Sequence, residues 1–207
     1  MSPTQRLLLF APGAGAPSGS PWMTSWTERL KVIGQVVRFD YPYAIAGKRS
    51  PDRLPVLIAA HRAALADARA QAPDSVILVG KSMGSRIGCH VALEEPVTAI
   101  VCLGYPLRSA RGDLRSDVLL ALRTPVLFVQ GSRDPLCPLE ALGAVRQRMV
   151  APTVLHVVEG SDHSLRLGAR ALRERQLTQE AIDDGIMAAV VAFVSGHATV
   201  DAPHAHS

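Results

Sequence analysis

The sequence predicts a three-layer α/β fold in which helices cover both faces of a mostly parallel sheet of about six strands. Six short apolar segments rich in β-forming residues recur along the chain, and turn-forming or polar residues follow them. They lack the alternation of polar and apolar residues that is typical of a sheet with one solvated face. Segments with helical spacing separate them, and this order predicts parallel strands joined by right-handed crossovers.

The predicted strands span residues 6–11, 35–40, 75–79, 99–103, 125–130 and 153–158, and the predicted helices span residues 22–33, 53–71, 82–93, 139–149 and 178–193. The helix over residues 53–71 has the clearest apolar stripe, which includes Leu54, Leu57, Leu65 and Ala68. No internal repeat or linker is visible. We therefore expect one domain over residues 1–195 and a disordered tail of small and polar residues over 196–207.

The composition argues against membrane and nucleic-acid partners. Hydrophobic residues make up 48% of the 207 residues, yet no stretch approaches the roughly 20 apolar residues of a membrane span. The net charge of +4 comes from scattered basic residues, and aromatic residues are only 4% of the chain. Three cysteines without a metal-binding pattern predict free thiols in a reducing compartment, and hence a cytoplasmic protein without structural disulfides. A homodimer is left open.

The motif Gly80-Lys81-Ser82-Met83-Gly84 stands directly between a predicted strand and a predicted helix. This is the G-x-S-x-G pattern of a nucleophile elbow, a turn so tight that its neighbouring side chains must be small. Such a turn presents the serine hydroxyl at the top of the sheet, beside the free N–H groups of the following helix. Ser82 is therefore the predicted nucleophile.

A serine hydroxyl is a weak nucleophile, so the prediction requires a histidine base and a carboxylate that orients it. Asp134 and His163 each follow the end of a predicted strand, in the expected order of serine, acid and histidine. Taken alone, Asp134 before Pro135 could merely start a turn, and His163 could be an ordinary loop residue. Asp162 is a rival acid, although a residue adjacent to the histidine rarely has room to reach its Nδ1.

Acyl transfer also needs two backbone N–H groups that bind the oxyanion. Met83, after the serine, supplies the first, and the glycine-rich loop after the first strand suits the second. Ala14 is the best donor there, with Gly15 next. A dinucleotide-binding loop is the alternative, but Ser18 stands where the third glycine should be, although Asp40 ends the second strand at about the right distance.

We accordingly predict no cofactor and no metal site. Three of the seven histidines, His197, His204 and His206, lie in the predicted tail without metal-site spacing. His61 and His90 fall within predicted helices, and His156 falls within a predicted strand, so we interpret all three as packing or surface residues.

The chain resembles small bacterial α/β-hydrolases similar to dienelactone hydrolase. The resemblance runs from Leu7 to about Val194, through the glycine-rich loop, the nucleophile turn and residues 38–43, 104–107, 131–135 and 162–165. Such loops usually begin with His-Gly, whereas Pro12 precedes Gly13 here. Some relatives use a cysteine nucleophile, and since this chain has Ser82, the resemblance implies a serine esterase with an α/β-hydrolase fold.

These observations predict a serine hydrolase that cleaves carboxylic esters of small or short-chain acyl groups through an acyl-enzyme. Thioester or lactone hydrolysis by the same residues, or a hydrolase-shaped interaction module without turnover, are the alternatives. Only residues 104–117 are available where larger relatives insert a cap, so we expect an open, uncapped site. Arg108, Arg111 and Arg115 in that segment could favour anionic substrates or simply form a solvated face.

Overall fold

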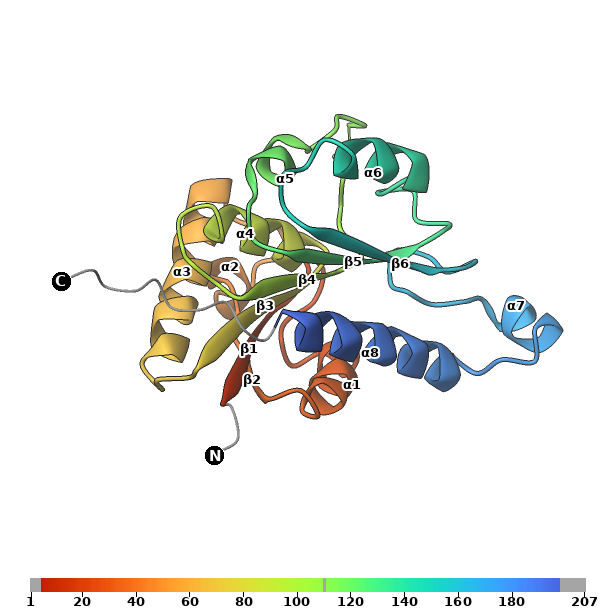
Figure 1. The fold of residues 1–207 in the computed structure, drawn as a ribbon, viewed down its shortest axis with the longest axis horizontal. Helices are drawn as coiled ribbons and strands as arrows, with labels where there is room; N and C mark the ends of the chain where they lie inside the picture. Colours follow the sequence, from red (N-terminus) through yellow and green to blue (C-terminus); the bar gives the residue numbers. More distant parts are fainter. Residues whose placement is uncertain (1–4, 110, 198–207) are drawn as a thin grey trace.

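A computed structural model describes residues 5–109 and 111–197 and confirms the predicted architecture. Six parallel strands form one sheet in the order β2-β1-β3-β4-β5-β6, with helices on both faces (Figure 1). The strands are β1 (Arg6–Ala11), β2 (Gln35–Arg38), β3 (Ser75–Lys81), β4 (Ala99–Leu103), β5 (Val126–Gly131) and β6 (Thr153–Val158). The helices are α1 (Pro21–Leu30), α2 (Pro42–Ile45), α3 (Leu54–Arg69), α4 (Met83–Val91), α5 (Asp117–Ala121), α6 (Leu139–Arg146), α7 (Ala169–Glu174) and α8 (Gln179–Gly196).

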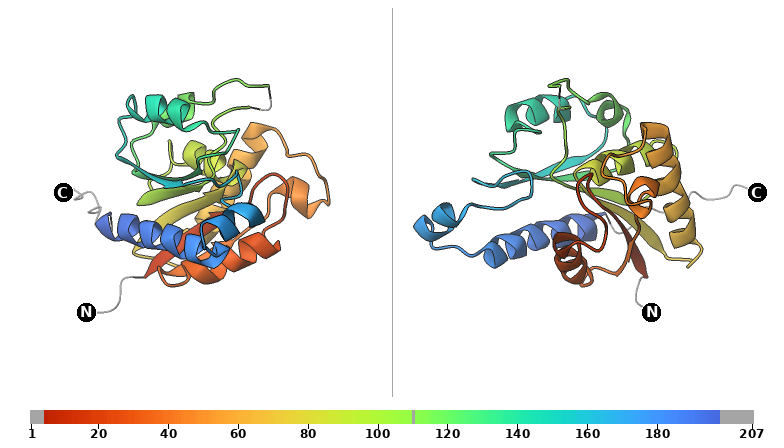
Figure 2. Two further views of the ribbon diagram at one scale, coloured as in Figure 1. Left: turned by 90° about the vertical axis from the view of Figure 1, so that its right-hand side faces the viewer. Right: turned by 180° about the vertical axis from the view of Figure 1, so that it is seen from behind.

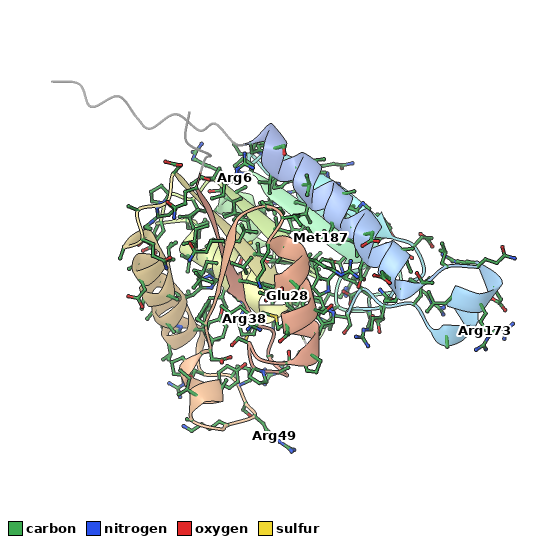
Figure 3. The ribbon with its side chains drawn as sticks, turned by 90° about the horizontal axis from the view of Figure 1, so that it is seen from below. Arg6, Glu28, Arg38, Arg49, Arg173 and Met187 are labelled. Carbon is green, nitrogen blue, oxygen red and sulfur yellow. The ribbon has the colours of Figure 1, made fainter. Side chains whose placement is uncertain are left out.

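The alternating side chains of the strands divide the core into two layers. Leu7 and Leu9 of β1 pack in one layer with residues of α3, α4, α5 and α6, whereas Leu8 and Phe10 pack in the other with α1 and α8. Figures 1 and 2 show these helix groups on opposite faces, and Figure 3 shows α1 and α8 in front of the sheet. Since side chains alternate along a strand, apolar residues at every position bury both faces.

The edge strands are less buried than the uniformly apolar pattern suggests. Every residue of β4 and β5 is buried, but no residue of β2 is, and Val154 of β6 remains 44% exposed. Strand β2 also ends at Arg38, two residues before its predicted end. These two strands are more exposed because an edge strand has a neighbouring strand on one side only.

The short helices α2, α5 and α7 were not predicted from the sequence. Their four to six residues are too few to show a helical periodicity.

The chain reverses its direction of travel across the sheet at β1, which lies between β2 and β3. Loops at the carboxyl ends of strands on either side of such a reversal diverge and leave a crevice, the usual place for ligands in open α/β sheets. The loops that leave β1 and β3 here are the glycine-rich loop and the turn at Ser82. The topology therefore brings the two predicted parts of the site together.

Among the described residues, neither α7 nor the segment after β4 forms a cap over the carboxyl ends of the strands. Helix α7 extends away from the sheet, with Arg173 far from its centre, and none of its residues is buried (Figure 3). No cap domain follows β4 in the described ranges, where residues 104–109 and 111–116 lead to α5. Of the predicted tail, Gly196 closes α8, and residues 198–207 lie outside the described residues. No helix among the described residues is long and apolar enough to cross a membrane.

Candidate active site

The turn from β3 into α4 places Ser82 in a conformation that few residues adopt. Its φ of 50° and ψ of −114° lie outside the helical and extended regions, and α4 begins at the next residue. A side chain on Gly80 would lie 2.2 Å from the Ser85 nitrogen, and one on Gly84 would lie 2.4 Å from the Ala11 carbonyl oxygen. The two glycines are therefore sterically required, as the pattern predicts.

Ser82, His163 and Asp134 form a hydrogen-bonded row at the carboxyl edge of the sheet. The His163 Nε2 atom lies 2.7 Å from Ser82 Oγ, and its Nδ1 atom lies 2.7 Å from Asp134 Oδ2. A carboxylate can only accept hydrogen bonds, so Nδ1 carries the ring proton and Nε2 accepts one from the Ser82 hydroxyl. Nε2 can then take up the hydroxyl proton when the serine reacts.

Three hydrogen-bond donors of the protein hold the Asp134 carboxylate. The residue is 3% exposed. Its Oδ1 accepts a hydrogen bond of 2.8 Å from the Leu136 N–H, while Gln130 Nε2 and His163 both donate to Oδ2. The Oε1 atom of Gln130 in turn accepts from the Tyr105 N–H at 3.0 Å, which fixes the orientation of the amide. Buried carboxylates need such partners, so the aspartate is held in one position.

The rival carboxylate, Asp162, has a different role. Its Oδ1 accepts hydrogen bonds from the N–H groups of Ser164 at 2.8 Å and Arg166 at 3.0 Å. These contacts close the turn that carries His163. Asp134, on the neighbouring loop, is the acid that lies against the imidazole.

The backbone of His163 is fixed from the opposite side by Lys81 and Gly104. Lys81 Nζ donates a hydrogen bond to the His163 carbonyl and lies 5.5 Å from the centre of the Trp22 ring. Burial lowers the pKa of Lys81 to about 8, against the opposing effect of the nearby Asp134 and Asp162 carboxylates. Gly104 has a φ of +68°, and a side chain there would lie 2.6 Å from the His163 carbonyl oxygen.

The loop after β1 approaches Ser82 closely. A side chain added at Gly13 would lie 3.5 Å from the Ser82 Cβ, at ordinary van der Waals distance, so this loop passes close beside the nucleophile turn. Neither Met83 nor Ala14 donates its N–H to an acceptor within the described part of the chain. Met83, Ala14 and Gly15 line the cavities at Ser82, and their role as oxyanion donors stays a prediction.

Two side chains, Tyr43 and Asp40, brace this glycine-rich loop. The Tyr43 hydroxyl donates to the Ala14 carbonyl at 3.2 Å. The Asp40 carboxylate accepts from the Ser18 N–H at 2.6 Å and from the Ser18 hydroxyl at 2.8 Å. Asp40, which follows β2, thus holds the end of this loop in place through Ser18.

Two cavities meet at Ser82. The larger, of about 670 Å³, is bordered by the glycine-rich loop, Trp22, Lys81 and His163. The other, of about 470 Å³, lies on the far side of Ala14 and Ser82, toward α3 and the segment after β4. Both volumes are typical of small-molecule sites.

The other histidines that the structure describes, and the cysteines, lie outside this site. His61 is fully buried, with its Nδ1 atom 3.1 Å from the Tyr41 hydroxyl oxygen, and burial lowers its pKa to about 3. His197 Nδ1 contacts the Phe193 carbonyl, whereas His204 and His206 lie outside the described residues. Cys89, Cys102 and Cys137 are buried free thiols. Within residues 5–109 and 111–197, no three histidine, cysteine or acidic side chains are grouped as metal ligands.

Several supporting residues were not predicted from the sequence. Gln130 is the next-to-last residue of the otherwise apolar strand β5. A polar residue at such a buried position usually has a hydrogen-bond partner, and this signal could have indicated that Gln130 supports Asp134. Gly104 directly follows a strand, where a glycine often marks a close backbone approach. The role of Tyr43 depends on contacts between segments that are 29 residues apart, and no local pattern encodes it.

Comparison with known proteins shows the family and the fold of the chain. A family model described as "Alpha/beta hydrolase domain" matches residues 4–195. Three solved structures share the fold at low sequence identity. An α/β serine hydrolase homologue from Coxiella burnetii is 20% identical with a TM-score of 0.67, covering 87% of this chain and 84% of its own.

Dienelactone hydrolase from Anabaena variabilis is 17% identical with a TM-score of 0.69, and the alignment covers 95% of this chain and 88% of that one. Est1E from Butyrivibrio proteoclasticus is 18% identical with a TM-score of 0.61, and the alignment covers 91% and 90% of the two chains. The family match spans all six strands of the sheet and both loops of the candidate site. The chain therefore belongs to the α/β hydrolase domain family.

Proposed function

We propose that the protein is a serine hydrolase that cleaves carboxylic esters of small or short-chain acyl groups through an acyl-enzyme. The observation that carries this proposal is the His163 ring, which joins Ser82 Oγ and Asp134 Oδ2 through two contacts of 2.7 Å. Nucleophile, base and orienting acid are the three roles that acyl transfer requires of side chains. The serine hydrolase homologue and the dienelactone hydrolase with the same fold are consistent with this chemistry.

The reaction follows from the proton positions. His163 Nε2 takes the hydroxyl proton as Ser82 Oγ attacks the ester carbonyl, and Asp134 stabilises the imidazolium that forms. The N–H groups of Met83 and Ala14 bind the oxyanion of the tetrahedral intermediate. When this collapses, the leaving-group oxygen takes the proton from Nε2. Water, deprotonated by His163 in its turn, then attacks the acyl-enzyme and releases the acid and free Ser82.

Labelling by a fluorophosphonate probe together with hydrolysis of 4-nitrophenyl butyrate tests this proposal. We expect the wild-type protein to be labelled at Ser82 and to hydrolyse the ester, and Ser82→Ala to lose both activities. Ser195→Ala is the matched control, because Ser195 is exposed on α8 and lines neither cavity. Labelling of Ser82→Ala, or its undiminished ester hydrolysis, would refute the assignment.

A substrate panel separates the ester activity from its alternatives. Butyryl thioesters and small lactones assayed beside 4-nitrophenyl butyrate rank the three reactions on the same residues. Absence of both probe labelling and turnover in the folded wild-type protein would favour an interaction module. A cytoplasmic location, the absence of nucleic-acid partners and the oligomeric state remain predictions of the sequence.

A further inference from the structure

The smaller cavity beside Ser82 is strongly basic. It is lined by Arg86 of α4 and by Arg108 and Arg115 from the segment between β4 and α5. Asp52 is the one acidic residue that lines it among the described residues, so three arginines and one aspartate leave a formal charge of +2. All three arginines are partly buried, whereas Arg111 of the same segment is exposed and lies outside the lining.

Two of these arginines have buried donors without acceptors among the described residues, although Arg108 Nη1 also donates a hydrogen bond of 3.4 Å to the Gly112 carbonyl. The Nε atoms of Arg86 and Arg108 are buried without an acceptor in the part of the chain that the structure describes. None of the three forms an ion pair with an acidic side chain of those residues. Buried donors without partners destabilise a protein, so an anion with several oxygens would satisfy groups that the chain leaves free.

The arginines also repel one another. Burial lowers the pKa of Arg86, and the positive charge of Arg115 lowers it further. A negative charge placed between these two side chains would relieve the repulsion. Guanidinium groups suit a carboxylate especially well, because their planar set of donors matches both of its oxygens.

The position of His163 decides which half of a substrate enters which cavity. The leaving-group oxygen must receive its proton from His163 Nε2. His163 lines the larger cavity and is absent from the lining of the smaller one. The leaving group therefore occupies the larger cavity, and the acyl chain extends from Ser82 into the smaller one.

The walls between Ser82 and the arginines are apolar. Leu54, Leu57, Met83 and Leu136 line this cavity along with the charged residues. Such walls suit a chain of methylene groups, whereas the arginines suit an anionic end. The cavity thus has the chemistry of an acyl group with a charge at its far end.

We propose that the cavity bearing Arg86, Arg108 and Arg115 binds a terminal carboxylate on the acyl chain, so that the preferred substrates are monoesters of short dicarboxylic acids. This inference rests on the serine hydrolase function proposed above and adds its substrate class. The reaction is the same as for a neutral ester: the acyl–oxygen bond breaks, water supplies the new oxygen, and the products are a dicarboxylate and an alcohol.

The test compares mono-4-nitrophenyl adipate with 4-nitrophenyl hexanoate, which have acyl chains of equal length with and without the carboxylate. The rate with Ser82→Ala is subtracted, because the free carboxylate accelerates the uncatalysed reaction. We expect kcat/KM of the wild-type protein to be at least about tenfold higher for the adipate ester than for the hexanoate ester. This ratio corresponds to the contribution of one hydrogen bond to a charged group. Added NaCl should reduce this preference by screening the charges.

Three substitutions test whether the preference for the adipate ester arises in this cavity. Arg86→Met and Arg108→Met should each lower the ratio of the two kcat/KM values about tenfold or more, and retained hexanoate hydrolysis shows that each variant is folded. Asp52→Asn should raise the ratio, because it removes the negative charge from the lining. Arg111→Met is the matched control, since it removes the same charge from the same segment outside the cavity, and it should leave the ratio within twofold.

The outcomes separate this inference from the proposed function. Hydrolysis of the hexanoate ester without preference for the adipate ester would overturn the carboxylate site and leave the serine hydrolase intact. A preference that Arg111→Met abolishes as strongly as Arg86→Met would also overturn it, because the cause would then be net charge. Failure of the folded wild-type protein to exceed Ser82→Ala on both esters would overturn the function itself.

Discussion

Replacement of Gly104 by alanine tests whether the position of the His163 loop controls turnover. Gly104 follows β4 with a φ of +68°, and an added Cβ would lie 2.6 Å from the His163 carbonyl oxygen and 3.0 Å from Lys81 Nζ. Ordinary contact begins near 3.4 Å, so the His163 backbone must retreat by about 0.8 Å, the difference of the two distances. Lys81, which holds the same carbonyl, would be displaced as well.

The size of the effect follows from that displacement. A misplacement of about 1 Å in a reacting group can lower a rate about 10²-fold, so we expect Gly104→Ala to lower kcat/KM by about two orders of magnitude. The left-handed backbone also costs an alanine about 1–2 kcal/mol. For a chain of this size, each 1 kcal/mol lowers Tm by about 2–4 °C.

Gly47→Ala separates the clash from the backbone cost. Gly47 has the same φ of +68°, but nothing lies within 4 Å of its added Cβ. Hydrolysis of 4-nitrophenyl butyrate and thermal unfolding are measured for both variants. Gly47→Ala should lose only the few degrees in Tm that the backbone cost predicts, and Gly104→Ala should lose at least as much because of its clash. Only Gly104→Ala should lose activity. Equal kcat/KM values for the two variants would show that the His163 loop does not depend on this contact.

Three further predictions concern charge and protonation. Asp134→Asn should lower kcat about 10⁴-fold because the amide favours the wrong imidazole tautomer, whereas Asp162→Asn should cost less than tenfold; steady-state kinetics compares them. Lys81 has a native pKa of about 8, below its unfolded value, so the unfolded chain binds more protons above pH 8. Between pH 7 and pH 10, urea titrations should therefore show the wild type gaining about 2–3 kcal/mol of unfolding free energy relative to Lys81→Met, and parallel pH profiles would contradict this. His61 has a native pKa of about 3, below its value of about 6.5 in the unfolded chain. The neutral, buried His61 therefore contributes fully to the unfolding free energy above pH 6.5, and this contribution is lost as the pH falls from 6.5 toward 3. From pH 7 to pH 4.5, the wild type should lose about 2–3 kcal/mol more unfolding free energy than His61→Phe, and an equal loss would assign acid sensitivity to other groups.

Local patterns were sufficient to predict the sheet and the three side chains of the hydrogen-bonded row. Apolar strands covered on both faces differ visibly from amphipathic helices, so all six strands could be placed. The turn at Ser82 has its own constraint, since Gly80 and Gly84 must be small whatever surrounds them. Asp134 and His163 could be predicted because the carboxyl ends of neighbouring parallel strands meet at one edge.

The tertiary structure gives the physical reason why Asp134, and not Asp162, lies against the imidazole. The sequence favoured Asp134 only because a residue adjacent to the histidine rarely has room to reach its Nδ1. The fold directs Asp162 toward the N–H groups of its own turn and brings Asp134 to the ring with support from Gln130. Hydrogen bonds between segments that are distant in the sequence determine which acid contacts the imidazole, and local sequence periodicity does not encode them.

The arginine cavity shows the same division between sequence and structure. The sequence alone predicted a basic segment with Arg108, Arg111 and Arg115, and could not say which of them face a ligand. The fold turns Arg111 to solvent and adds Arg86 from α4, one helical turn beyond Ser82. The sequence thus determined which elements form and which chemistry their ends carry, because both depend on neighbouring residues. Only the packing of those elements decided which charges share a cavity, because side chains from separate loops meet there.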